Sequence, residues 1–274
     1  MADDPVAAVT EAEATGETAA IFGDIRAVYR VGVVNLIWRH LATIPDALPW
    51  AWNAVRPLYV DGTVARAALA LRSGLRSPVL APVPPEVFAS VGLSPGDLDR
   101  IRAVLAAYGR TNSMASIALS ACVAEGGAVG GGAVGGGEVS AAMTPIDDDI
   151  PLPALTPLSA MAPHVAALVV RLNSFGAAGE RPILASMYRH LSHWPPYLGL
   201  AWGALAPLQA SGALRAAIAA TSDRATTVAA CIPMRQGPAP PGAREAIAPF
   251  IGDVIPKMVA ICGMLQAMTT APDA

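Results

Sequence analysis

Two short stretches carry the side chains best suited to chemistry. Asn112 lies in a polar run at residues 109–113, between two apolar segments of helical pattern. An amide there can position a water molecule or a carboxylate, or it can cap a turn. The second stretch, residues 179–186, contains Glu180 and Ser186, and a carboxylate at Glu180 could take a proton from water or be a solvated loop residue. Asn112, Glu180 and Ser186 are therefore the candidate catalytic residues.

The histidines offer a weaker signal. His40 and His190 each follow an arginine, Arg39 and Arg189, in matching sequence contexts, so we expect both histidines to be structural and the arginines to pair or cap nearby. His190 and His193 have a helical spacing that can bind a metal, but no third ligand is identifiable. The sequence also contains no phosphate-binding glycine loop and no serine nucleophile elbow. We predict no metal and no cofactor.

An internal repeat organises the chain. Residues 38–62 and 187–212 share an aromatic-Arg-His-Leu motif followed by proline, leucine, Ala-Trp, Pro-Leu and glycine in constant register. Such agreement indicates a duplication. The pairs, each 150 residues apart, are Arg39 and Arg189, Pro45 and Pro195, Trp52 and Trp202, and Gly62 and Gly212.

A linker separates the two copies. Residues 126–137 consist only of Gly, Ala and Val. An acidic run at 147–149 then precedes a proline-rich segment that ends at Pro157. Glycine gives flexibility and proline prevents regular structure. We predict a first helical unit at 1–125, a linker at 126–157 and a second helical unit at 158–274.

Both units have the periodicity of helices. Apolar residues recur at helical spacing in residues 21–29 and 98–108, no segment alternates with period two, and Ser94 with Asp97 predicts a capped helix start. The fold class is therefore all-α, an internally duplicated repeat that forms a pseudo-dimer within one chain. We expect a pocket between the halves, with the chemistry carried by residues that only one half possesses; Trp52 and Trp202 are expected in the core or the interface.

Composition excludes several classes of function. Of the 274 residues 54% are hydrophobic and 14% charged, and the mean hydropathy is +0.47, which excludes intrinsic disorder. The net charge is −3 without a basic cluster, so we expect no nucleic acid. The longest uncharged stretch, about 191–214, is interrupted by three prolines, and its earlier copy carries charges, so we expect no membrane span.

Three cysteines are widely spaced in apolar surroundings, and the N-terminus lacks the pattern of a signal peptide. We expect Cys122, Cys231 and Cys262 to be buried free thiols in a reducing compartment. The predicted location is the cytoplasm.

A set of short motifs extends along nearly the whole chain: Gly16-Glu17, Asp24-Ile25-Arg26, Arg30-Val31, Leu41-Ala42-Thr43, Pro45, Leu48-Pro49, Ala51-Trp52, Arg102, Val104-Leu105, Asn112, Val134-Gly135-Gly136, Glu138-Val139-Ser140, Trp194-Pro195, Leu205-Ala206-Pro207 and Phe250-Ile251. These motifs resemble the group I (D,L-type) 2-haloacid dehalogenases, a family that is itself all-helical and internally duplicated.

The resemblance implies hydrolysis of a carbon–halogen bond in a short 2-halocarboxylic acid by a water that an aspartate activates, without a covalent enzyme ester. Asn112 matches the asparagine that holds this water. The aspartate follows an Ala-Ser pair, and after Ala185 and Ser186 this chain has Met187, which cannot accept a proton. A different placement of the insertion gives Glu180 that position.

The expected substrate pocket is also more apolar than in the family. Val33 and Leu36 replace aromatic residues and Ile247 replaces a tyrosine, so the predicted substrate-binding residues are Val33, Leu36, Met187, Ile247 and Ile251. Three functions remain open: a dehalogenase-like hydrolase with altered or lost activity, another small-molecule enzyme on this scaffold, and a non-catalytic protein that binds a small apolar ligand. The expected partner is a small molecule, a short carboxylic acid in the first case, and a homodimer is left open.

Overall fold

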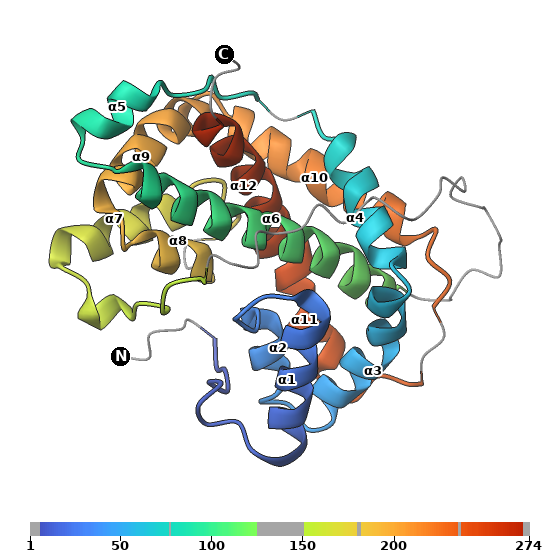
Figure 1. Cartoon of the computed structure of the whole chain (residues 1–274). Helices are drawn as coiled ribbons and strands as arrows, with labels where there is room; N and C mark the ends of the chain where they lie inside the picture. Colours follow the sequence, from blue (N-terminus) through green and yellow to red (C-terminus); the bar gives the residue numbers. More distant parts are fainter. Residues whose placement is uncertain (1–5, 77, 125–150, 180–181, 235–236, 271–274) are drawn as a thin grey trace.

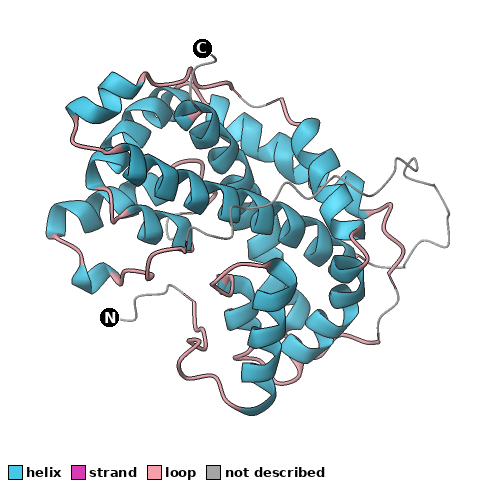
Figure 2. Cartoon of the chain, in the orientation of Figure 1, coloured by secondary structure: helices cyan, strands magenta, loops and turns pink. Residues whose placement is uncertain are grey.

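The computed structural model describes residues 6–76, 78–124, 151–179, 182–234 and 237–270. Every regular element in these ranges is a helix, which confirms the all-α prediction (Figure 2). Glu180 and most of the predicted linker lie outside the described residues. The elements are α1 (Gly16–Tyr29), α2 (Leu36–Leu41), α3 (Ala47–Val60), α4 (Thr63–Ser73), α5 (Pro85–Ser90), α6 (Pro95–Val123), η1 (Leu158–Ala160), α7 (Pro163–Ser174), α8 (Ser186–Leu191), α9 (Pro195–Ala210), α10 (Ala213–Ala229), α11 (Ala243–Pro249), η2 (Phe250–Val254) and α12 (Ile255–Thr269).

Helix bounds recur with the spacing of the sequence repeat. Helices α8 and α10 begin 150 residues after α2 and α4, and α9 ends 150 residues after α3. Gly62 and Gly212, the residues before α4 and α10, have positive φ angles of 77° and 78°, a conformation that favours glycine. These matched bounds are what a duplication would produce, and the common origin of the halves stays a prediction.

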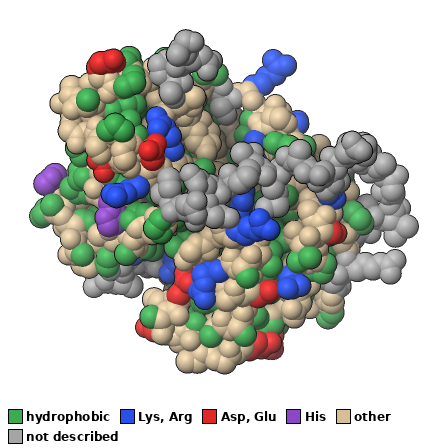
Figure 3. Space-filling view, viewed as in Figure 1, with side chains coloured by type: hydrophobic (Ala, Val, Ile, Leu, Met, Phe, Trp, Pro, Cys, Tyr) green, Lys and Arg blue, Asp and Glu red, His purple; other side chains and the backbone are tan. Residues whose placement is uncertain are grey.

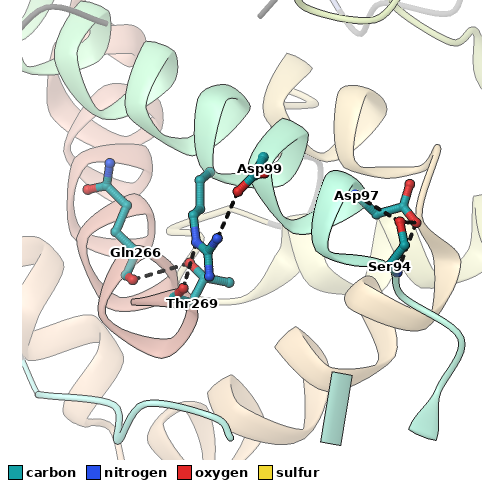
Figure 4. A network of polar contacts seen from close by, with 6 residues as sticks. Ser94, Asp97, Asp99, Gln266 and Thr269 are labelled. Atoms are coloured by element: carbon teal, nitrogen blue, oxygen red, sulfur yellow. Dashed lines mark hydrogen bonds and ion pairs between the residues drawn. The ribbon is translucent and has the colours of Figure 1, made fainter. Parts of the chain in front are cut away.

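The long helix α6 runs through the middle of the molecule and packs against α12, α4 and α10 (Figure 1). Its start is fixed locally, because the Ser94 hydroxyl accepts from the Asp97 backbone N–H at 3.1 Å and the Asp97 carboxylate accepts from the Ser94 N–H at 3.0 Å (Figure 4). Arg102 then links α6 to α12, since its Nε donates to the Thr269 carbonyl at 2.9 Å. The predicted capped start at Ser94 is confirmed.

The two large hydrophobic cores each combine elements from both predicted units. The first core packs the N-terminal half of α6 against α7–α10 and α12, and the second packs α1–α3 against the C-terminal half of α6, α11 and η2. A smaller core joins α4, α6 and α10. Both cores therefore contain helices from each side of the predicted linker.

One helical run among the described residues, residues 243–269 of α11, η2 and α12, is long and apolar enough to cross a membrane, but 67% of its most apolar window is buried within the protein. Burial of that kind is typical of a core helix. Most of the uncharged segment considered from the sequence forms α9, with Leu198 and Leu205 in the first core.

Two expectations about burial need correction. Cys122 and Cys262 are buried, but Cys231 is exposed just after the end of α10. Trp52 is buried between aromatic neighbours, whereas Trp202 on α9 is 41% exposed. The repeat in sequence therefore does not give both tryptophans the same environment. Over the face in Figure 3, basic and acidic side chains are interspersed.

Candidate functional site

A cavity of about 990 Å³ lies where the N-terminal segment, α2, α6 and α8 meet. Both halves of the chain line it, as expected for a pocket between the repeats. Its volume lies at the upper end of the roughly 300–1,000 Å³ range of ligand pockets. The lining residues are Val6, Ala7, Ala8, Thr10, Glu11, Glu13, Val33, Val34, Asn35, Arg39, Thr43, Tyr108, Leu155, Pro157, Ser186, Arg189 and His190.

Two buried arginines face this cavity. Arg39 and Arg189 are 6% and 5% exposed, and each is the fourth residue of its helix, α2 and α8. Arg189 donates from Nε to the Thr156 carbonyl at 3.0 Å, which fixes one edge of its guanidinium. Arginine presents a planar fork of N–H donors that suits carboxylates, so two such groups at one cavity favour an anionic ligand.

His190 lies beside the arginines at the end of α8. Its Nδ1 lies 3.0 Å from the Tyr108 hydroxyl, and its buried Nε2 has no hydrogen-bond partner within the described part of the chain. Burial, the largest cause, together with the charges of His193 and Arg189, lowers the pKa of His190 to about 4. The imidazole is therefore neutral near pH 7, and when Nδ1 donates to Tyr108 its Nε2 can accept a proton.

Tyr108 holds this histidine from α6. Burial raises the pKa of its phenol, while the positive charge of Arg39 opposes that rise. The Ser186 hydroxyl and Arg189 also act to lower the pKa, so both guanidinium groups are close enough to influence one phenol. Tyr108 stays protonated at neutral pH and serves as a fixed polar partner for His190.

Asn112 lies one layer behind the cavity surface. Its Oδ1 accepts from Asn35 Nδ2 at 3.4 Å, and Asn35, which lines the cavity, also donates to Thr111 Oγ1 at 3.3 Å. Asn112 Nδ2 is buried and makes no hydrogen bond among the residues that the structure describes. Asn112 therefore reaches the cavity through Asn35.

A buried lysine supports the segment that leads into α8. Lys257, the only lysine in the sequence, donates from Nζ to the Asn173 carbonyl at 2.9 Å at the end of α7. The Asn173 side chain accepts from the Ala185 N–H at 3.0 Å and donates to the Ile183 carbonyl at 3.1 Å. These bonds fix the backbone just before Ser186, the first residue of α8.

The structure gathers only some of the residues proposed from the sequence. Val33 and Ser186 line the cavity, and the buried Ser186 Oγ has no hydrogen-bond partner in the described ranges. Met187 points elsewhere, with its Sδ 3.2 Å from Cys262 Sγ in the first core. The other three apolar candidates, Leu36, Ile247 and Ile251, belong to or pack against the second core.

Sequence reasoning missed the charged part of the site. Arg39, Arg189 and His190 were set aside because they recur in both copies, yet His40 and His190 have different surroundings. His40 is half-buried with Nδ1 2.7 Å from the Ala7 carbonyl, whereas His190 is fully buried against Tyr108. The arginine that recurs at Arg39 and Arg189 was the signal that could have revealed the cavity.

No group of three His, Cys, Asp or Glu side chains able to hold a metal occurs among the described residues. His193, the possible partner of His190, points to the proline-rich segment instead. Its Nε2 is 2.8 Å from the Ala154 carbonyl and 3.1 Å from Thr156 Oγ1. The spacing of the two histidines in the sequence therefore does not bring their rings to one point.

The fold is an all-helical haloacid dehalogenase-like fold. A solved structure of D-2-haloacid dehalogenase in complex with L-LA superposes with a TM-score of 0.71 at 19% identity, covering 97% of this chain and 98% of the other. A mutant of D-2-haloacid dehalogenase with D-2-CPA gives a TM-score of 0.65 at 20% identity over 98% and 92% of the two chains. No family model and no curated protein matches the sequence.

Proposed function

We propose that this chain is a cofactor-independent hydrolase of small carboxylic acids, similar to the 2-haloacid dehalogenases, and that the cavity at Arg39, Arg189 and His190 is its active site. One observation carries the proposal: two buried arginines and a neutral histidine with an available Nε2 face the same cavity. The fold similarity supports the reaction class. The predicted cytoplasmic location suits such an enzyme.

The substrate carboxylate would bind the arginines and present its α-carbon to the cavity. A water molecule held by His190 Nε2 attacks that carbon, the carbon–halogen bond breaks, and the bonding electrons leave with the halide. His190 takes the proton released by the water and later gives it to solvent. The products are the 2-hydroxy acid, halide and one proton, and no ester to the enzyme forms.

Substrate binding itself would strengthen the base. Burial of the ring, with the charges of His193 and Arg189, holds the pKa of His190 low in the free protein. A bound carboxylate brings a negative charge that offsets the positive field, and a nearby opposite charge stabilises the protonated imidazole. The pKa of His190 therefore rises when the anion is present, which favours proton transfer from water.

His190 replaces the base that the resemblance would place at Met187, three residues earlier on α8. A thioether cannot accept the proton, and Met187 faces Cys262 instead of the cavity. Glu180 stays a second candidate for the base, with Asn112 and Ser186 as polar groups that orient water. The alternative function, binding of a small apolar ligand, is less favoured by this cavity, because charged side chains are among its lining residues.

Halide release from racemic 2-chloropropionate tests the proposal, with wild type compared to His190→Gln and Glu180→Gln. We expect His190→Gln to lower kcat by about 10²–10⁴-fold, the usual contribution of a general base. His40→Gln, the matched control at the equivalent repeat position, should keep the wild-type kcat. Circular dichroism and thermal melting verify that each variant is folded.

Three results would count against this account. Absence of halide release at high wild-type concentration overturns the dehalogenase function. Release that survives His190→Gln unchanged removes His190 from the mechanism, and a large loss in Glu180→Gln alone assigns the base to Glu180.

A further inference from the structure

The lining of the cavity divides by element into polar and apolar side chains. Helices α2, α6 and α8 contribute only polar or charged residues to it, whereas its apolar residues all come from the segments between helices. A ligand in this cavity therefore meets both kinds of surface, which suits a molecule with a polar group and an aliphatic part. The apolar lining residues are Val6, Ala7, Ala8, Val33, Val34, Leu155 and Pro157.

Leu155 is the largest of these apolar side chains, and it is packed differently from the leucines near it in the sequence. Leu152 and Leu158 pack against the first core. Leu155 is half-buried, lines the cavity and belongs to none of the hydrophobic cores that the described residues form. An aliphatic side chain in that position loses contact with water only when a ligand covers it, and removal of apolar surface from water favours binding.

Hydrogen bonds fix the backbone on both sides of Leu155. The Ala154 carbonyl accepts from His193 Nε2 at 2.8 Å, and the Thr156 carbonyl accepts from Arg189 Nε at 3.0 Å. Thr156 Oγ1 also lies 3.1 Å from His193 Nε2. Pro157, the next residue, has a restricted φ angle. The segment therefore holds Leu155 in place before a ligand arrives, which lowers the ordering cost of binding.

Val33 adds a second aliphatic side chain from the other half of the chain. It is half-buried and lines the cavity, and within the described ranges it too lies outside the three cores. Its neighbour Val34 is buried in the second core, and the Val34 N–H donates to Glu11 Oε1 at 2.9 Å. The backbone beside Val33 is thus fixed as well, and each half of the chain supplies one aliphatic side chain that packs only toward the cavity.

We infer that Leu155, together with Val33, selects substrates that carry an aliphatic chain longer than methyl on the carbon next to the carboxylate. The inference rests on the proposed function for the reaction, and it names the substrate class as 2-halo acids such as 2-chlorohexanoate. The polar side chains of the helices contact the reacting end, and the aliphatic chain lies against Leu155. Water replaces chloride at the second carbon, and the products are 2-hydroxyhexanoate, chloride and one proton.

Calorimetric titration with racemic 2-hydroxyhexanoate and racemic lactate tests this inference without turnover, because both are hydroxy acids of the product type. The longer acid has three more methylenes, and each fully buried methylene strengthens binding by about fourfold. We expect 2-hydroxyhexanoate to bind wild type at least tenfold more tightly than lactate.

Variants assign the preference to this part of the cavity. Leu155→Ala should reduce the preference for 2-hydroxyhexanoate at least threefold. Leu69→Ala is the matched control, because Leu69 of α4 is 42% exposed and lies outside the cavity lining, and it should keep the wild-type preference. Equal binding of the two acids to wild type would overturn the inference, and so would a preference that Leu155→Ala leaves unchanged.

A second variant and a second measurement cover the case in which Leu155→Ala fails to fold. Val33→Ala should also lower the preference, and an unchanged preference in this variant would then overturn the inference. At equal concentration, 2-hydroxyhexanoate should raise the melting temperature of wild type more than lactate does, since a tighter ligand stabilises the native state more. Equal thermal shifts would contradict the aliphatic site.

The two proposals fail separately. Tight binding of 2-hydroxyhexanoate that depends on Leu155, without halide release from 2-chloropropionate or 2-chlorohexanoate, refutes the hydrolase and leaves the aliphatic site standing. Halide release with the same kcat/KM for both halo acids, and no binding preference between the two hydroxy acids, refutes the aliphatic site and leaves the hydrolase standing.

Discussion

Replacing His190 with glutamine should remove much of the acid sensitivity of the folded protein. Burial lowers the pKa of His190 to about 4 from an ordinary value of 6.5. Between these values the unfolded chain binds a proton that the native protein does not, so the free energy of unfolding falls as the pH falls. From pH 7.5 to pH 4.5 this single group accounts for roughly 2.5 kcal/mol, at about 1.36 kcal/mol for each unit of pKa.

Urea unfolding followed by circular dichroism measures the effect at the two pH values. Carboxylates that titrate in the same range contribute equally to wild type and variant, so the informative quantity is the difference between the two losses. Wild type should lose roughly 2.5 kcal/mol more than His190→Gln. His40→Gln retains His190 and should lose as much as wild type. An equal loss in wild type and His190→Gln would refute the reasoning, because the native imidazole would then accept its proton without penalty.

Three further tests address capping, a buried charge and backbone conformation, all by denaturant unfolding. Ser94→Ala should lower the free energy of unfolding by about 1 kcal/mol because it removes the cap of α6, and a variant as stable as wild type would contradict that role. Burial lowers the pKa of Lys257, so between that lowered value and the ordinary value of 10.5 the unfolded chain holds a proton that the native protein has released, and stability rises with pH in this window. Lys257→Met should abolish this slope, and a retained slope would exclude Lys257 as its source. Gly199→Ala in exposed helix should add up to about 1 kcal/mol, whereas Gly176→Ala should destabilise, because φ is +69° and a Cβ would collide with Ile218; effects of the same sign would contradict this contrast.

Local signals in the sequence predicted the helices well. The start of α6 follows from Ser94, Pro95 and Asp97 alone, because capping is a matter of a few adjacent backbone groups. The corresponding bounds of α2 and α8 also follow the repeated Arg-His-Leu motif. Prediction succeeded where the physical cause lies within one turn of the chain.

Packing between the halves could not be predicted from the sequence. The N-terminal half of α6 packs with α7–α9 of the other half, and α11 packs with α1–α3. Helical periodicity shows that a helix has an apolar face, but it does not show which helix covers that face. The prediction of two consecutive units therefore did not show that each core contains helices from both.

Only part of the candidate site could be predicted from the sequence, because the site also depends on packing between distant helices. The family resemblance led to Val33 and Ser186, which line the cavity, and to Asn112 one layer behind it. Arg39 and His190 were excluded because residues that recur in both copies were expected to be structural. That expectation assumed that equivalent positions have equivalent surroundings. Burial of His190 against Tyr108 comes from α6, which is distant in sequence.

Chemical rescue of a His190→Ala variant by imidazole tests most directly the claim that His190 is the base of this site. His190→Ala removes the proposed base and opens space in the cavity, so added imidazole can take the place of the missing ring. Halide release from 2-chloropropionate should fall by at least about a hundredfold in this variant and recover in proportion to imidazole concentration. Arg39→Gln should show no such recovery. Wild-type release that exceeds the variant by less than twofold, or a variant that imidazole does not restore, would contradict the assignment of His190 as the base of this site.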